Sequence, residues 1–155
     1  MKKSNPDILT KAKKYAFLLL KSRPRSEKEL RERLEIKKID STIIKEVIGL
    51  LKAGKLIDDA QFAKLWIAQR LEKPFGLGKI QEELKLKGIR EAIIEKQLNE
   101  IRQGYSEEEV VLETAKEKLA KDSGQDLLKA KRKIYSYLLR NGFSEDKVRE
   151  CMDKL

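Results

Sequence analysis

Hydrophobic residues recur along this 155-residue chain in a pattern that is repeated three times. When residues 27–51 are aligned with residues 77–101 and with residues 131–155, six columns of three residues are apolar throughout. In each segment the first two apolar positions lie four residues apart, and the last three follow at intervals of four and three. This spacing is typical of two helices that each bury one side. The columns are Leu30, Ile80 and Ile134; Leu34, Leu84 and Leu138; Ile39, Ile89 and Phe143; Ile44, Ile94 and Val148; Ile48, Leu98 and Met152; and Leu51, Ile101 and Leu155.

A further helical segment precedes each pair, so the repeated unit contains three helices. Ser4 to Asp7, the pair Asp58 and Asp59, and Ser106 to Glu109 each supply residues that favour a helix start. The Ser-x-x-Glu spacing of a capping box occurs at Ser106 and again at Ser26, before the second helix of the first unit. Each unit therefore contains a first helix followed by the repeated pair.

These patterns predict an all-α fold of nine helices in three tandem three-helix repeats, which comprise residues 1–55, 56–103 and 104–155. Helix-breaking residues at 74–78 and loop-forming residues at 121–126 mark two of the connections. A unit of about 50 residues is barely able to bury a core alone, so neighbouring units should stack. We expect an elongated, curved helical array that contacts a partner along its length.

A glycine turn separates the last two helices of the second and third units. Gly88 and Gly142 each precede an apolar residue, an arrangement that ends a helix with a residue in the left-handed conformation. The first unit has Lys38 at the corresponding position. Its turn is therefore either strained or closed in a different way.

Composition agrees with a helical fold and narrows the range of functions. Charged residues make up 40% of the chain, and there are only 8 Gly and 3 Pro, which favours helices with wide solvated faces. The net charge of +10 points to a polyanionic partner, such as nucleic acid or a nucleoprotein. Because the chain has no His, Ser-His and Cys-His nucleophile pairs and His-containing metal sites are excluded.

The cellular compartment is predicted from cysteine usage and hydropathy. A single cysteine, Cys151, cannot form an internal disulfide or a Cys-based zinc site, and we expect it to be a small apolar residue of the last helix. The longest apolar run, Tyr15 to Leu20, is far shorter than the ~20 residues of a membrane span. We expect a cytoplasmic, monomeric protein with no cofactor, no metal and no membrane association.

The positive charge is concentrated in the first third of the chain. Residues 1–55 hold 16 basic and 7 acidic side chains, residues 56–103 hold 9 and 8, and residues 104–155 hold 11 of each. The densest basic stretch is either a solvated helix face, since four glutamates interleave with it, or a surface that binds phosphate or carboxylate groups. Its arginine content favours binding. The stretch contains Lys21, Arg23, Arg25, Lys28, Arg31 and Arg33.

Three smaller motifs each have two interpretations. Asp58 and Asp59 are the best carboxylate pair for a magnesium-dependent nuclease, but acidic residues at a helix start are explained by capping and by the helix dipole. The segment from Gly76 to Lys79 lacks most of a phosphate-binding loop and favours a turn between helices. Trp66 and Phe62 either stack on bases or belong to the core, and their four-residue spacing on one apolar stripe favours the core.

One block of the chain combines Asp-Asp, Phe-Ala, Trp and Arg at fixed spacing with a downstream Lys-Gly-Ile. Together with flanking motifs on both sides, this block resembles the RecX family, regulators of the RecA recombinase. The resemblance covers nearly the whole chain from about Ala12, and Lys38 is its main departure. The segments that carry it are Gly54 to Arg70, Gly76 to Gly78, Ile80 to Ile89, Arg25 to Leu34 and Tyr137 to Ser144.

The resemblance implies three tandem three-helix units, no catalysis, and a protein that lies in the helical groove of the RecA filament on single-stranded DNA. Such a protein limits filament growth, strand exchange and coprotease activity. Eight basic residues are our candidates for contact with the filament or with exposed DNA backbone. The first group is Arg23, Arg25, Lys28 and Arg31, and the second is Arg70, Lys73, Lys79 and Lys87.

Three other functions remain as alternatives. A general basic nucleic-acid-binding protein made of helical repeats would bind naked DNA and filament equally well, with a strong dependence on salt. A scaffold that binds only proteins would have no affinity for DNA. An enzyme would show turnover that depends on Asp58 or Asp59.

Overall fold

The structure is a computed structural model that describes residues 6–122, 124 and 126–155. These residues form nine α-helices and no β-strand, which confirms the predicted fold class. The helix-start residues Ser4 and Asn5 and two residues of the predicted 121–126 loop, 123 and 125, lie outside the described residues. The helices are α1 (Pro6–Ser22), α2 (Glu27–Ile36), α3 (Ser41–Ala53), α4 (Asp59–Arg70), α5 (Leu77–Leu86), α6 (Glu91–Arg102), α7 (Glu107–Lys121), α8 (Leu127–Arg140) and α9 (Glu145–Lys154).

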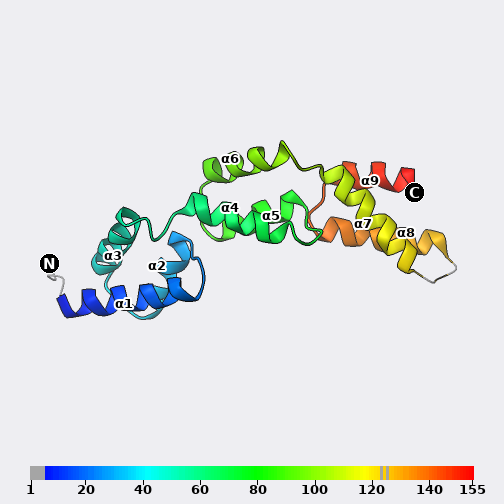
Figure 1. Cartoon of the computed structure of the whole chain (residues 1–155). Helices are drawn as coiled ribbons and strands as arrows, with labels where there is room; N and C mark the ends of the chain where they lie inside the picture. Colours follow the sequence, from blue (N-terminus) through cyan, green and yellow to red (C-terminus); the bar gives the residue numbers. More distant parts are fainter. Residues whose placement is uncertain (1–5, 123, 125) are drawn as a thin grey trace.

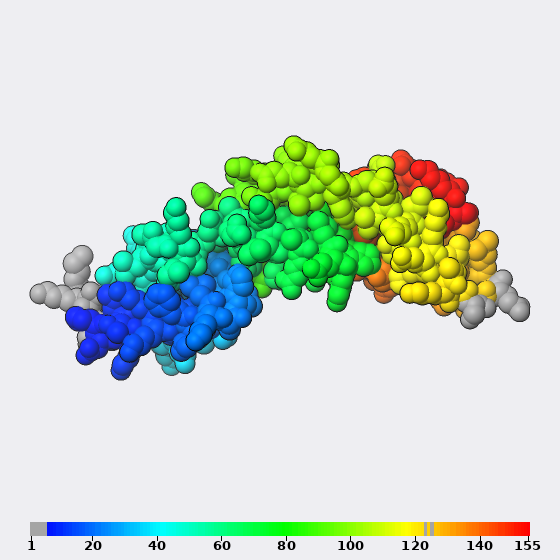
Figure 2. Space-filling view, in the orientation of Figure 1, coloured from blue at the N-terminus to red at the C-terminus, as the bar shows by residue number. Residues whose placement is uncertain are grey.

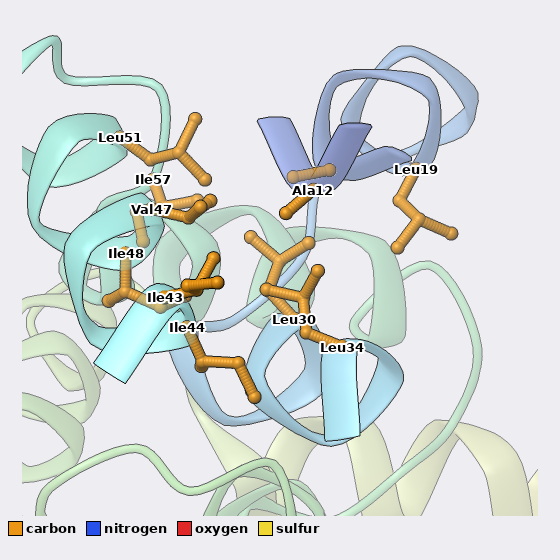
Figure 3. Close-up of a cluster of buried hydrophobic side chains, with 11 residues drawn as sticks. Ala12, Leu19, Leu30, Leu34, Ile43, Ile44, Val47, Ile48, Leu51 and Ile57 are labelled. Atoms are coloured by element: carbon orange, nitrogen blue, oxygen red, sulfur yellow. The ribbon is translucent and has the colours of Figure 1, made fainter. Parts of the chain in front are cut away.

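Each set of three consecutive helices encloses its own hydrophobic core. In the first unit, Leu30 and Leu34 of α2 are fully buried in a cluster with side chains from α1 and α3 (Figure 3). The second core lies among α4, α5 and α6, and the third among α7, α8 and α9. The first, second and fourth apolar columns of the sequence repeat are buried in all three units. The threefold pattern of apolar residues in the sequence therefore corresponds to three separate hydrophobic cores.

The three units follow one another along an elongated, arched molecule (Figure 1). The first unit, coloured blue to cyan, lies at one end, and the third, coloured yellow to red, lies at the other (Figure 2). The middle unit therefore contacts both neighbours. We call its contact with the first unit junction 1 and its contact with the third unit junction 2.

Both junctions contain the same hydrogen bond. The first backbone N–H of α2, at Glu27, donates to the carboxylate of Asp59 at the start of α4 (3.0 Å). The first backbone N–H of α5, at Leu77, donates to the carboxylate of Glu107 at the start of α7 (3.0 Å). The first N–H groups of a helix have no partner within it, and an acidic side chain near them is also favoured by the helix dipole. An acidic residue of one unit thus caps the middle helix of the unit before it.

A glycine turn also packs against the neighbouring unit at each junction. Gly88 has a φ of +79°, and a Cβ added there would lie 2.6 Å from Cβ of Lys28 in the first unit. Gly142 has a φ of +86°, and an added Cβ would lie 2.5 Å from the backbone nitrogen of Lys79 in the second unit. Both positions need glycine for two reasons, the left-handed backbone and the close approach of the neighbouring unit.

The first unit shows why its turn has no glycine. Lys38 takes the same left-handed conformation, with a φ of +59°, and its side chain is exposed. Because the Lys38 side chain is exposed, a Cβ is sterically accepted at this turn. The turn is closed in the same way as the other two, and the remaining cost is the left-handed conformation of a non-glycine residue, about 1 kcal/mol.

We expect Lys38→Gly to stabilise the protein by about 0.5 kcal/mol, because glycine removes the left-handed strain and loses part of that gain through its more flexible unfolded chain. Thermal unfolding followed by circular dichroism measures the change. Lys38→Ala is the matched control, since it removes the same charge and keeps a Cβ. An equal gain in both variants would show that charge, and not backbone conformation, is responsible.

Candidate partner-binding surface

Glu29 connects the first candidate group to the second. It is the third residue of α2, and its carboxylate accepts a hydrogen bond from the backbone N–H of Ser26, which completes the predicted capping box. The same side chain binds Arg23 at 2.6 Å and Lys87, across junction 1, at 3.2 Å. Burial opposes ionisation of Glu29, but the hydrogen bonds from Arg23, Ser26 and Lys87 outweigh it and lower its pKa from 4.5 to about 2.

A row of alternating cations and aromatic rings continues from Lys87 across the middle unit. The Nζ atom of Lys87 lies 5.3 Å from the ring centre of Trp66, and the guanidinium of Arg70 lies 5.9 Å from the same ring. Arg70 also lies 4.0 Å from the ring of Phe75, and Nζ of Lys79 lies 4.6 Å from that ring. Each contact is a cation–π interaction. We call Lys87, Trp66, Arg70, Phe75 and Lys79 the cation–π row.

The cation–π row reaches from one junction to the other. At one end Lys87 binds Glu29 of the first unit. At the other end Lys79 lies against Gly142 of the third unit. In the middle, Arg70 is held by two hydrogen bonds to Glu83, at 2.8 and 3.1 Å. Because these cations are fixed by rings and by a carboxylate, they present charge from defined positions on the surface.

The structure thus brings together three of the four residues in the second candidate group, and it links them to Arg23 of the first group through Glu29. Lys73 is exposed in the connection between α4 and α5, away from any ion pair within the described chain. It remains a candidate, because an exposed cation is free to meet an external anion.

The other three members of the first group make contacts inside the fold. Lys28 donates to the Leu86 carbonyl across junction 1 (3.3 Å), and Arg25 donates to the Ser22 hydroxyl (3.1 Å). Arg31 lies 4.0 Å from Glu27. Burial and the charges of Arg23 and Arg33 lower the pKa of Arg25. The side chains of Arg31 and Lys28 are still 43% and 48% exposed, so they hold the fold and also present charge to solvent.

Of the two interpretations of the aspartate pair, the structure supports the structural one. Asp58 caps α4 by accepting from the backbone N–H groups of Ala60 and Gln61, while Asp59 serves junction 1. Burial and the neighbouring Glu27 carboxylate raise the pKa of Asp59. Within the described chain, no group of three or more His, Cys, Asp or Glu residues is arranged to hold a metal ion. The two aspartates therefore have structural roles, one as a helix cap and the other as a contact between units.

The aromatic pair belongs to the edge of the second core, as the spacing predicts. Phe62 is buried, and its ring stacks on that of Trp66 at a centroid distance of 5.9 Å. Trp66 is only half-buried, and its indole Nε1 is the one buried side-chain polar atom without a hydrogen-bond partner in the described chain. Cys151 is buried in α9, and burial raises the pKa of its thiol, as expected of a structural residue.

One cationic feature escaped the sequence analysis. A groove of about 540 Å³ lies between α7 and α8 in the third unit, whose net charge is zero. Counting charges by unit concealed it, because the balancing acids lie elsewhere on the same unit. Lys133 and Arg140, seven residues apart on one face of α8, are the signal that points to it. We call this the α7–α8 groove, and it is lined by Lys118, Lys121, Asp122, Ala130, Lys133, Ile134, Tyr137 and Arg140.

Three tandem three-helix units, joined by repeated junctions, define an all-α helical-repeat protein. No helix in the described part of the chain is both long enough and apolar enough to cross a membrane. Comparison with known proteins identifies the family. Residues 12–51, 58–98 and 106–152 match the first, second and third three-helix domains of RecX, respectively.

Whole-chain relatives agree. The regulatory protein RecX of Chlorobium phaeobacteroides is 35% identical over 146 residues, which cover 94% of this chain and 93% of that protein. RecX of Clostridium acetobutylicum is 33% identical over 149 residues, 93% of this chain and 68% of that protein. The crystal structure of RecX from Lactobacillus salivarius superposes with a TM-score of 0.81 at 25% identity, over 97% of this chain and 98% of that one. The chain belongs to the RecX family of regulatory proteins, which are non-catalytic.

Proposed function

We propose that this protein binds the RecA nucleoprotein filament on single-stranded DNA, lies along its helical groove and mostly inhibits filament growth, strand exchange and coprotease activity. Membership of the RecX family supports regulation of RecA. The partner is a polyanion coated with identical protein subunits, which suits a net charge of +10 on an elongated array of repeats.

The repeated junction is the observation that carries the proposal. The same backbone-to-carboxylate hydrogen bond joins the first unit to the second and the second to the third. A chain of similar units joined in the same way presents related surfaces at successive positions, as solenoid proteins do. A filament of identical subunits also presents one surface at successive positions. The repeated units of the chain and the repeated subunits of the filament are therefore suited to contact each other several times along one groove.

A salt titration of the fluorescently labelled chain against single-stranded DNA tests this function, with and without a nucleotide-stabilised RecA filament formed on that DNA. We expect markedly tighter binding to the filament and a change in the rate of ATP hydrolysis by RecA. Binding that is equal or weaker once RecA coats the DNA would overturn the proposal and favour a general nucleic-acid-binding protein.

The candidate cations make the proposal testable by residue. Replacing Lys28, Lys73 and Lys79 by Gln should weaken filament binding by about tenfold or more, because three charge contacts of about 0.5–1 kcal/mol each are lost. Filament affinity at constant salt is the measurement. The control replaces Lys14, Lys45 and Lys96 by Gln, three exposed lysines outside the candidate set. Equal weakening by both variants would mean that only overall charge matters.

A further inference from the structure

The third unit separates its charges onto two grooves. The α7–α8 groove is lined by four cations and one carboxylate. A smaller groove of about 150 Å³ between α7 and α9 is lined by Glu108, Glu109 and Glu150 together with Lys147 and Lys154. The zero net charge of residues 104–155 therefore hides one strongly cationic groove, of whose lining Asp122 is the one acidic member.

The cations of the α7–α8 groove are not paired with a carboxylate in the part of the chain that the structure describes. Within the described chain, Lys118, Lys121, Lys133 and Arg140 form no ion pair within 4 Å, in contrast to Arg23, Arg70 and Lys87. The carboxylate of Asp122 lines the same groove but accepts a hydrogen bond from the Gly124 backbone N–H at 2.7 Å. The groove thus holds a clear excess of positive charge.

A purely structural role accounts for these cations only in part. Lys118, Lys121 and Arg140 lie in the last turns of α7 and α8, where basic residues complement the helix dipole. Lys133 lies in the middle of α8, and the dipole does not explain it. Four like charges that converge on one groove repel one another, which costs stability unless an external anion is bound.

The groove also offers apolar and aromatic surface. The ring of Tyr137 is half-buried in its wall, with Nζ of Lys118 3.8 Å from the ring centre, which fixes that cation in position. Leu127 is 55% exposed and lies one helical turn before Ala130 of the lining, although it does not itself line the groove. Cationic grooves with aromatic and apolar side chains are typical of sites that hold single strands of nucleic acid.

We propose that the α7–α8 groove binds the phosphate backbone of single-stranded nucleic acid directly, without RecA. Cations from both walls surround one strand, and Leu127 contacts a base beside it. A groove of about 540 Å³ is of the size that holds a small organic ligand, so it accommodates one or two nucleotides of a strand. This hold on DNA is additional to the filament contact proposed above, and either is testable without the other.

The test uses the full chain and a fluorescein-labelled oligothymidylate, without RecA, followed by fluorescence anisotropy across a range of salt concentrations. The groove variant is Lys121→Gln with Arg140→Gln. The matched control is Lys116→Gln with Arg132→Gln, which also removes one lysine of α7 and one arginine of α8, both exposed and outside the groove lining. Circular dichroism of both variants checks that the fold is retained.

We expect the groove variant to bind roughly tenfold more weakly and to reduce the slope of log affinity against log salt by about 1.4, since each phosphate contact on a single strand contributes about 0.7. The control removes the same two charges from outside the groove, where salt screens them from the bound strand, and should weaken binding by less than about twofold. Equal losses in both variants would overturn the site. Equal affinity for a duplex would overturn the choice of a single strand, and equal affinity for polyglutamate would overturn the choice of nucleic acid.

Discussion

Gly76→Ala is expected to destabilise the protein by about 2–4 kcal/mol, although Gly76 has an ordinary φ of −75°. An added Cβ would overlap the carbonyl group of Gly142 and the backbone nitrogen of Phe143 in the third unit. These are backbone atoms, which cannot move aside as a flexible side chain does. The overlap would also displace the backbone N–H of Gly76 from the Asn141 carbonyl, to which it donates at 2.7 Å. Junction 2 would open.

Chemical denaturation followed by circular dichroism measures this loss, and Gly49→Ala is the matched control. Gly49 lies within α3, and an added Cβ there meets nothing within 4 Å. Alanine should therefore stabilise the protein by about 0.5–1 kcal/mol at that position. A loss below about 0.5 kcal/mol in Gly76→Ala would show that junction 2 is loosely packed and does not fix the third unit.

The cores and the junctions differ in how far sequence reveals them. Three aligned copies of one pattern identify Leu34, Leu84 and Leu138 as core residues, because helix periodicity is local and all three are fully buried. Junction hydrogen bonds join residues 30 or more positions apart, such as Glu27 with Asp59. The aspartate is equally consistent with simple helix capping, so the pattern alone does not reveal its partner.

Lys38 illustrates the same limit. Its place in the alignment shows that one of three turns lacks glycine, but the reason lies in what packs against the turn. Gly88 and Gly142 face a neighbouring unit, and Lys38 faces solvent. Glycine in this turn therefore has two roles: it allows the left-handed backbone, and it leaves room for the neighbouring unit. Only the second role differs among the three units.

The candidate site was predicted in part for a related reason. The sequence indicated basic residues of the middle unit, and the structure places Arg70, Lys79 and Lys87 around two aromatic rings. That arrangement depends on three-dimensional proximity that no spacing encodes. The net charge of each unit did not indicate the α7–α8 groove of the third unit, because a sum of charges contains no information on which face carries each residue.

Glu29→Gln is expected to lower stability by about 2–3 kcal/mol at neutral pH, because this carboxylate serves a helix cap and two cations at once. Its side chain is only 12% exposed, so solvent screens these interactions weakly. The neutral amide keeps the shape and can still accept from Ser26, but it loses the charge that holds Arg23 and Lys87. Urea unfolding measures the change. Glu82→Gln is the control, since Glu82 is 72% exposed and should cost less than about 0.5 kcal/mol.

The pH dependence separates the charge of Glu29 from its role as a cap. The pKa of Glu29 is about 2 in the folded protein and 4.5 as an ordinary glutamate, so the unfolded chain takes up the proton first as pH falls. The stabilisation is complete above about pH 5 and is lost between pH 4.5 and 2. The stability difference between the native protein and Glu29→Gln should therefore be constant from pH 7 to pH 5 and shrink below it. A stability difference that persists unchanged to pH 3 would assign the effect to the geometry of the cap. The ion pairs of Glu29 would then make no contribution to the stability of junction 1.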